Sequence, residues 1–386
     1  MDLFNIAVKE KRLHPLFNKI ISEEVYKPTI DVINQWSKGL IGRKKESKKF
    51  VQDFQIGFNS ALWELYLNKA FIDLGFEIDY TKESPDFHLT HKSGTIVNVE
   101  AVTANNKDNE SEEYYSSESF RTSIQLNDAD FLDQSSIKSS IKLAGKIKDK
   151  RDLFIGVNNK KFPYSILEHV KDNAFIVAVA PFDNHLSFSQ NNMAINRVLY
   201  GINPPTLDKN GTFKVERIDR ILNHNNQPVD LGIFTNDSYK EISAVIFSTT
   251  GMFGKAVIQA GIKGFVRATR YRQMDTDEFI KKEGPDMLGV SHRKTSENSS
   301  VCSTRMISGN LVCGSDMFIY DTNEHKETHL DGLHIYYNPY ASIPLEESLF
   351  LAHEITRNYY DVENQSMICK HNDGSLVSRQ VFPLLS

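Results

Sequence analysis

The sequence predicts an α/β protein in which helices flank a mixed β-sheet. Segments with apolar residues at helical spacing alternate with short apolar runs of strand length, and a hairpin pattern lies between two helical segments. With 386 residues and a hydrophobic fraction of 40%, the chain can form a substantial core. We divide it into a basic helical segment (1–50), a core of alternating helices and strands (51–182) and a C-terminal α/β region (183–386), which either belongs to the same domain or follows it.

Residues 51–74 predict a helix that stops at Gly75, because glycine commonly follows the last helical turn. Its apolar residues recur at helical spacing and include Phe54, Phe58, Ala61, Leu62, Leu65 and Leu74. Glu64 lies in the middle of this apolar stretch, where a lone ionised carboxylate would be costly to bury. We therefore expect Glu64 to have a partner.

Residues 84–104 predict a β-hairpin in which two acidic residues face each other. The loop Lys92-Ser93-Gly94 provides a glycine for the left-handed position of a three-residue turn. The resulting register opposes Thr90 to Ile96, His88 to Asn98 and Asp86 to Glu100. The other face is apolar and carries Phe87, Leu89, Val97, Val99 and Ala101. Two opposed carboxylates either share a proton or bind a hard cation, and we interpret the pair as a metal site.

The order of these acidic residues resembles the PD-(D/E)XK nuclease superfamily. A helix Glu is followed by Pro85-Asp86 at the start of one strand and by Glu100 at the end of the next. The resemblance implies a restriction-endonuclease-like sheet in which Glu64, Asp86 and Glu100 hold Mg²⁺ or Mn²⁺, with the carbonyl of Ala101 as a further ligand. It also implies a metal-dependent endonuclease, with DNA as the expected substrate and restriction or defence against foreign DNA as the expected role.

The chain departs from the family pattern at Val102, which occupies the position of the motif lysine. A predicted helix at 133–150 offers a replacement, because Lys138, Lys142 and Lys146 follow each other at intervals of four residues. We favour Lys146, followed by Lys142. The alternative is that this stripe is a solvated helix face. The chain would then be a catalytically degenerate member that binds nucleic acid or a partner protein without cutting.

The net charge of −5 does not by itself favour nucleic acid, but the basic residues are clustered. The segments 42–49, 138–151 and 266–272 are basic, and the last interleaves arginines with Tyr271, which could stack on a base. Surface solubility is the better explanation of any single cluster. A third possibility, hydrolysis of a small nucleotide or another phosphoester, needs the same metal ligands but no basic surface. Cleavage of two strands would favour a homodimer.

Several other motifs predict ordinary structure. Residues 251–255 resemble a phosphate loop, but the spacing is too short, so we expect a turn at the start of a helix. His325, His329 and His334 are close in sequence, but we interpret them as scattered surface histidines rather than metal ligands. Gln55 lies on the opposite helix face from Glu64, and we expect it to serve in packing.

Cysteine use and hydropathy predict a cytoplasmic protein with no membrane partner. Cys302, Cys313 and Cys369 show neither a disulfide framework nor paired metal-binding spacing, which favours a reducing compartment. The first residues lack the apolar segment of a signal peptide, and no apolar run is long enough to span a bilayer.

The remaining elements are predicted from the same periodicities. We expect strands at about 76–81, 175–180, 244–248 and 333–337, and helices after Gly251 and at 345–357. The segment 105–133 is rich in Asp, Glu, Ser and Asn, and we interpret it as a solvated excursion between the hairpin and the lysine-bearing helix.

Overall fold

The computed structural model describes residues 2–42, 47–104, 129–157, 162–182, 191–207, 209, 213–283, 287–308 and 311–384. It is a mixed α/β structure, which confirms the predicted class. In spatial order, the strands of the large central sheet are β1 (Glu77–Ile78), β2 (Phe87–Thr90), β3 (Ile96–Thr103), β4 (Ala174–Ala180), β9 (Ala244–Ser248), β14 (Leu333–Tyr337), β15 (Thr356–Asp361) and β16 (Ser366–Lys370). The pairs β3–β4, β4–β9 and β14–β15 are parallel and the others antiparallel.

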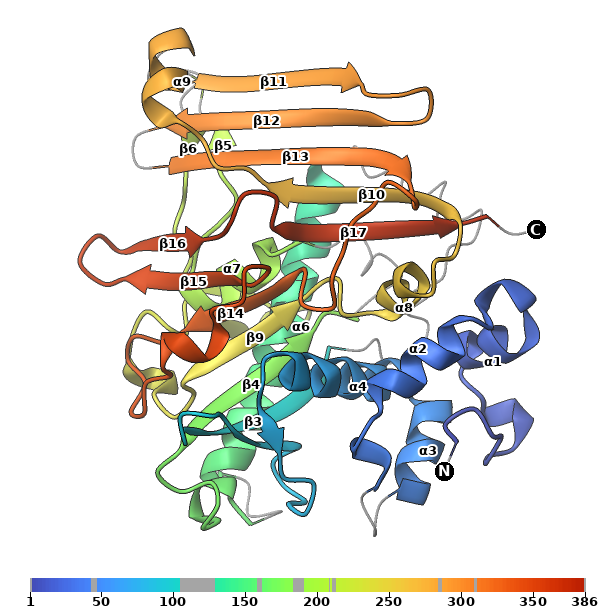
Figure 1. The fold of residues 1–386 in the computed structure, drawn as a ribbon. Helices are drawn as coiled ribbons and strands as arrows, with labels where there is room; N and C mark the ends of the chain where they lie inside the picture. Colours follow the sequence, from blue (N-terminus) through green and yellow to red (C-terminus); the bar gives the residue numbers. More distant parts are fainter. Residues whose placement is uncertain are drawn as a thin grey trace.

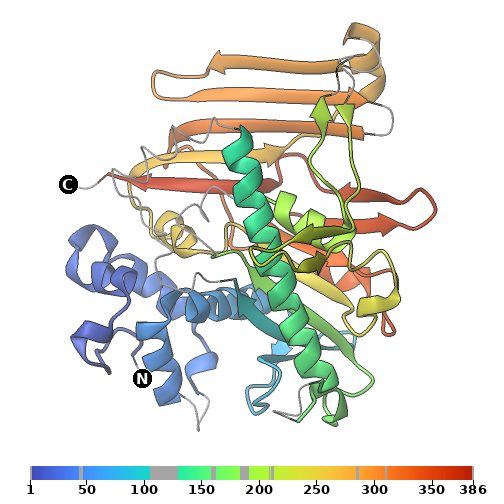
Figure 2. The same ribbon diagram turned by 180° about the vertical axis from the view of Figure 1, so that it is seen from behind.

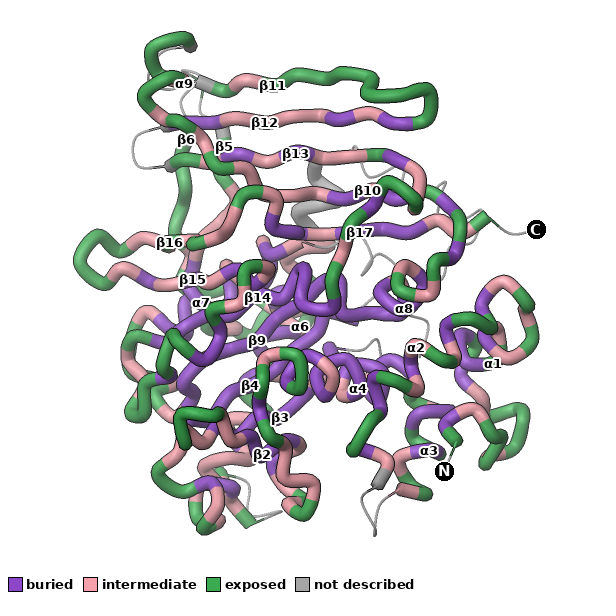
Figure 3. The backbone as a smooth tube through the Cα atoms, viewed as in Figure 1, coloured by how far each residue is buried: buried purple, intermediate pink, exposed green. Residues whose placement is uncertain are grey.

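A second, five-stranded antiparallel sheet lies beside the central one (Figure 1). Its strands, in spatial order, are β11 (Met287–Lys294), β12 (Ser300–Ser308), β13 (Leu311–Asp321), β10 (Gly264–Tyr271) and β17 (Leu376–Pro383). Two small hairpins are formed by β5 (Thr206–Leu207) with β6 (Phe213–Lys214), and by β7 (Arg220–Leu222) with β8 (Pro228–Asp230). Figure 3 shows that β11, an edge strand of the second sheet, is exposed, whereas β4 and β9 of the central sheet are buried.

Helices cover both faces of the central sheet. On one face α4 (Phe58–Asp73) packs against the sheet, and α1 (Pro15–Ser22), α2 (Thr29–Trp36), α3 (Ser47–Ile56) and α8 (Phe253–Gln259) belong to the same buried core. The other face packs against α6 (Ala129–Ile155) and α7 (Met193–Tyr200), and α6 runs along this face in Figure 2. The short helix α9 (Thr276–Glu283) precedes β11. Because both faces are covered, β4 reads as an unbroken apolar run and all seven of its residues are buried.

The predicted helix at 51–74 is wrong in one respect, because the structure has two helices there. Gly57 has φ −109° and ψ 49°, which interrupts the helical backbone between α3 and α4. The apolar pattern spans both helices, so periodicity alone did not reveal the break. The predicted stop at Gly75 is confirmed, since this residue follows α4 with a φ of +81°.

The predicted helix at 345–357 is also wrong. A short 3-10 turn at Glu347–Phe350 is followed by strand β15, which begins at Thr356. Burial alternates strictly along β15, because successive side chains of a strand point to opposite faces of the sheet. The strands predicted at 244–248 and 333–337 are confirmed with identical bounds. Residues 105–128 of the predicted excursion lie outside the described residues, and α6 occupies its end.

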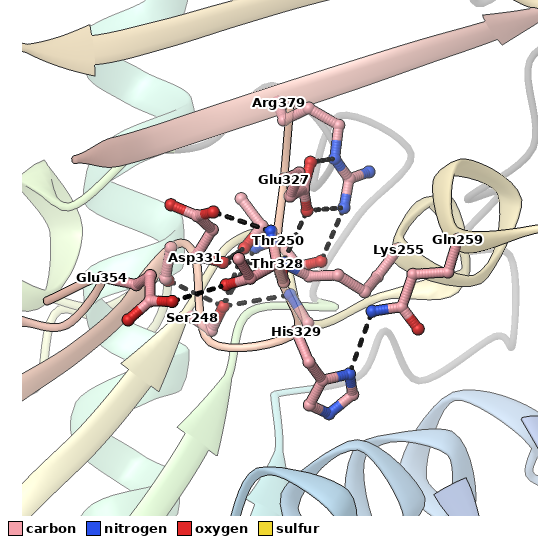
Figure 4. A network of polar contacts seen from close by, with 12 residues as sticks. Ser248, Thr250, Lys255, Gln259, Glu327, Thr328, His329, Asp331, Glu354 and Arg379 are labelled. Atoms are coloured by element: carbon pink, nitrogen blue, oxygen red, sulfur yellow. Dashed lines mark hydrogen bonds and ion pairs between the residues drawn. The ribbon is translucent and has the colours of Figure 1, made fainter. Parts of the chain in front are cut away.

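The motif at 251–255 is confirmed as a turn at the start of a helix, α8, and Lys255 takes part in a buried ion network (Figure 4). Its Nζ lies 2.5 Å from Oε1 of Glu327, and Arg379 Nε of β17 lies 3.1 Å from Oε2 of the same carboxylate. Lys255 also donates to the carbonyls of Thr328 and Asp331, at 3.0 and 2.7 Å. This network joins the second sheet to α8 and to the loop that leads into β14.

The expectation of surface histidines is wrong for all three positions. His325, His329 and His334 are 6%, 7% and 1% exposed. His325 bonds to Glu327 and Tyr320, and His329 bonds through its two ring nitrogens to Gln259 and the Tyr66 carbonyl. Sequence spacing gave no signal for the burial of His329, because its hydrogen-bond partners come from distant segments of the chain.

Buried histidines should make the fold sensitive to mild acid. Burial lowers the pKa of His14 and His334 to about 4 and that of His329 to about 3. Below pH 6.5 the unfolded chain protonates these rings while the folded chain does not, so stability falls as the pH decreases. We expect a loss of about 1 kcal/mol per histidine between pH 7.5 and 5.5, measured by urea unfolding. His334→Phe should remove about one third of this loss; equal stability at the two pH values would contradict the assignment.

Gln55 is confirmed as a packing residue. Its side chain is fully buried and bonds to the carbonyls of Leu3 and Asn5 and to the amide of Ala7, which fastens the N-terminal segment to α3. The three cysteines are free thiols. Within the described ranges, no helix is both long enough and apolar enough to cross a bilayer.

Candidate active site

The hairpin that carries two of the predicted acidic residues has the predicted register. Strands β2 and β3 pair Phe87 with Val99, His88 with Asn98, Leu89 with Val97 and Thr90 with Ile96. Gly94 has a φ of +86°, which is the left-handed conformation expected in the turn. The ladder ends at Phe87, so Asp86 lies just outside it. Instead of standing in the ladder opposite Glu100, Asp86 accepts a hydrogen bond from the Ala101 amide at 2.8 Å.

The polar face of the hairpin is buried beneath α6, and this determines the environment of Glu100. Glu100 is 4% exposed, and its Oε1 accepts a hydrogen bond from Lys150 Nζ at 2.6 Å. Its Oε2 is buried and has no hydrogen-bond partner in the described structure. The Tyr164 hydroxyl lies 3.5 Å from Oε1 and donates weakly to it.

Lys150 is the lysine that the structure places at these carboxylates. Burial lowers its pKa, but the charge and the hydrogen bond of Glu100, together with the charges of Asp86 and Glu64, outweigh that effect and raise the pKa. Lys150 is therefore protonated at neutral pH. All three predicted acids act on one ammonium group, although they come from α4, β3 and the segment before β2.

Sequence reasoning favoured Lys146 and Lys142 and missed Lys150. The stripe of lysines at intervals of four continues to Lys150, so the signal was present, but the predicted helix ended at that residue. In the structure α6 continues to Ile155, which leaves Lys150 more than a turn inside the helix. Lys146 is half-buried one turn earlier, and Lys142 two turns earlier, both on the same helix.

Glu64 is half-buried on α4, and the helix that carries it is fastened to the central sheet. Trp63 Nε1 donates to the Ala178 carbonyl of β4 at 3.1 Å, and the hydroxyls of Ser60 and Thr103 lie 2.6 Å apart. These two contacts set the position of α4 over β3 and β4. These contacts hold the helix that carries Glu64 against the central sheet.

Two histidines beside the acids are held in defined tautomers. Asn98 Nδ2 donates to the His169 carbonyl, so Asn98 Oδ1 is the acceptor for His88 Nδ1–H at 2.9 Å. His169 Nε2–H donates to the Ser84 carbonyl at 2.7 Å. The rings of His88 and His169 meet edge to face, with centroids 5.4 Å apart.

The donor chemistry of the three acids fits a hard divalent cation. Carboxylate oxygens are the ligands that Mg²⁺ prefers, and Glu100 Oε2 is a buried oxygen without a compensating donor. The described residues contain no group of three His, Cys, Asp or Glu side chains already arranged around a metal position. The Ala101 amide donates its hydrogen bond to Asp86.

The basic segment 266–272 is occupied mainly by internal contacts. Tyr271 stacks on His371, with centroids 4.5 Å apart, and does not offer a free ring to a base. Arg270 donates to the Gly374 carbonyl and Arg272 binds Asp316. In the segment 42–49, Lys48 and Lys49 are exposed, whereas residues 43–46 lie outside the described residues.

Comparison of the chain with protein-family models, curated proteins and solved structures gave no match.

Proposed function

We propose that the protein is a Mg²⁺- or Mn²⁺-dependent nuclease that hydrolyses phosphodiester bonds in DNA. The observation that carries the proposal is the hydrogen bond from Lys150 to Glu100, within the electrostatic influence of Asp86 and Glu64, with one buried oxygen of Glu100 left without a donor. A helix acid followed by acids on neighbouring strand segments is also the order that the nuclease resemblance implies. The proposal includes a cytoplasmic location, in accord with three free cysteines, and a homodimeric form for cutting both strands.

Each residue has a distinct role in this proposal. Asp86 and Glu100 hold the cation, and Glu64 orients the attacking water. Bound Mg²⁺ supplies Lewis acidity, which activates water near neutral pH and offsets charge on the phosphate. Because its pKa is raised, Lys150 donates hydrogen bonds and stabilises the negative charge that develops on the phosphate oxygens, rather than acting as the base.

Asp86→Asn should abolish metal-dependent cleavage while preserving the fold. Asparagine keeps an oxygen that can accept from the Ala101 amide but lacks the charge that holds a cation. We expect a loss of at least about 100-fold in the cleavage rate. The assay uses plasmid, linear duplex, single-stranded DNA and RNA in Mg²⁺ or Mn²⁺.

The matched control is Asp79→Asn, because Asp79 is bonded locally to Thr81 in the turn before β2. This variant should cut like the wild type. Equal cleavage by wild type and Asp86→Asn would show either a contaminating nuclease or a wrong assignment of the site.

A second candidate function is nucleic-acid or protein binding by a catalytically degenerate scaffold. Two observations favour it: Val102 replaces the motif lysine, and Lys150 already neutralises Glu100. Calorimetric titration with Mn²⁺ separates the two candidates. If the protein is a nuclease, the wild type should bind Mn²⁺ and Asp86→Asn should not. If it is a degenerate scaffold, neither protein should release or absorb heat on titration, and neither should cleave.

A further inference from the structure

The second sheet contains a cationic side chain that the fold leaves without a counterion. Arg267 of β10 is half-buried, and burial alone lowers its pKa, with no carboxylate contributing to the shift. Its Nε donates to the Met317 sulfur at 3.3 Å, which is a weak acceptor. In the described residues Arg267 has no ion pair. The other arginines near the two sheets' junction differ, because Arg272 binds Asp316 and Arg379 binds Glu327.

An unsatisfied amide occupies the cross-strand position opposite Arg267. Arg267 and Gln380 are cross-strand partners of β10 and β17, so their side chains project from the same face of the sheet. Gln380 is 4% exposed, and neither its Nε2 nor its Oε1 has a hydrogen-bond partner in the described structure. A buried amide without partners costs free energy, as does a partly buried charge without a counterion. Two such costs at adjacent positions indicate a missing polar ligand.

The chemistry of the two side chains specifies an anion. The Arg267 guanidinium offers planar N–H donors without an acceptor oxygen, and the Gln380 amide adds two more N–H donors. Phosphate provides several acceptor oxygens and pairs with arginine in bidentate geometry. We propose that Arg267 and Gln380 form a binding site for a phosphate group on the second sheet.

Neighbouring residues on the same face favour a phosphate that belongs to a nucleotide. Phe265 and Phe382 are cross-strand partners of β10 and β17. Phe265 lies two residues from Arg267, and Phe382 lies two residues from Gln380, so both rings project from the face that carries Arg267 and Gln380. Phe265 is 37% exposed. An aromatic ring beside a phosphate site can stack on a base in a sequence-tolerant manner. The site does not depend on the metal-binding acids of the proposed function.

Thermal unfolding of the full chain tests the site. At constant ionic strength, inorganic phosphate, adenosine monophosphate and a short oligodeoxynucleotide are each compared with chloride. We expect the wild type to melt about 2–4 °C higher with a bound phosphate group. Arg267→Met should lose this response and should melt in chloride at or above the wild-type temperature, because a partly buried charge without a counterion has been removed.

The matched control is Arg272→Met, at the residue that directly follows β10. It breaks the ion pair with Asp316, so it should melt lower in chloride yet keep the response to phosphate. Gln380→Leu should weaken the response without abolishing it. Asp86→Asn should leave it unchanged, which separates this site from the proposed nuclease site.

The proposal is overturned if the wild type responds to none of the ligands, or if Arg267→Met responds as the wild type does. Equal shifts with inorganic phosphate and with the nucleotides support the site and identify the free anion as its ligand. Larger shifts with the nucleotides, reduced to the phosphate level by Phe265→Leu, support the site and identify a nucleotide.

Discussion

Replacing Glu327 with Gln should lower the free energy of unfolding by about 3–5 kcal/mol. The Glu327 carboxylate is fully buried and is the counterion of both Lys255 and Arg379, whose side chains are 0% and 1% exposed. The amide leaves two buried cations without their shared negative charge. A substitution that leaves a buried charge uncompensated is among the most destabilising single substitutions. Urea unfolding at pH 7.5 measures the loss.

The control for this prediction is Glu297→Gln, at an exposed position between β11 and β12, which should change stability by no more than about 0.5 kcal/mol. Lys255→Met should also destabilise, since it leaves Glu327 with a single cation. A loss of less than about 1 kcal/mol in Glu327→Gln would show that the network contributes little to the fold.

The same network should fail in strong acid. Burial raises the pKa of Glu327, but the charges of Arg379 and Lys255 and the hydrogen bond from His325 outweigh that effect and hold it well below the usual range. A carboxyl group with a lowered pKa stabilises the fold above its unfolded pKa of about 4.3 and loses that contribution as the pH falls. Below this pH, the free energy of unfolding of Glu327→Gln should therefore fall less than that of the wild type.

Replacing Lys150 with Met should have two measurable consequences. Glu100 is 5% exposed at its side chain and would lose its cation, so we expect the free energy of unfolding to fall by about 3–5 kcal/mol. If the nuclease proposal holds, the cleavage rate should fall by at least about 100-fold, because the donor that stabilises the phosphate oxygens is removed. Unfolding in urea and the plasmid assay measure the two effects separately.

Two variants on α6 and β3 make the interpretation of Lys150→Met specific. The Lys148 side chain is 59% exposed where it pairs with Asp152, so Lys148→Met should cost less stability than Lys150→Met and should leave cleavage intact. The double variant Lys150→Met with Glu100→Gln should regain most of the lost stability, because it removes the buried charge as well as its partner. No recovery in the double variant would contradict the ion-pair explanation.

The hairpin is a feature of this protein that the local sequence was sufficient to predict. Its register was predictable because a glycine-containing turn and a two-residue alternation act within about twenty residues, and a one-residue slip would have exposed the apolar face. The two apolar strands β9 and β14 were predictable for a similar reason. By contrast, the segment 345–357 has mixed character, and pairing with β14 determined that its end is a strand.

The candidate site was predictable in its acidic residues but not in its lysine. Glu64, Asp86 and Glu100 could be identified because each lies within a strongly patterned element. Lys150 could not be chosen from the stripe on α6, since every member has the same spacing and only the packing of the helix on β3 decides which one meets Glu100. The break at Gly57 was hidden for a related reason, because the apolar pattern continues through it.

The sequence by itself determined the α/β class, the hairpin with its acids and most of the central strands, since these follow from periodicity and turn chemistry along a continuous stretch of chain. Only the tertiary structure decided the burial of His325, His329 and His334, the ion network of Lys255, Glu327 and Arg379, and the pairing of Arg267 with Gln380. These features join residues that are distant along the chain. Their environments depend on which surfaces the folded elements bury together, and no local pattern carries that information.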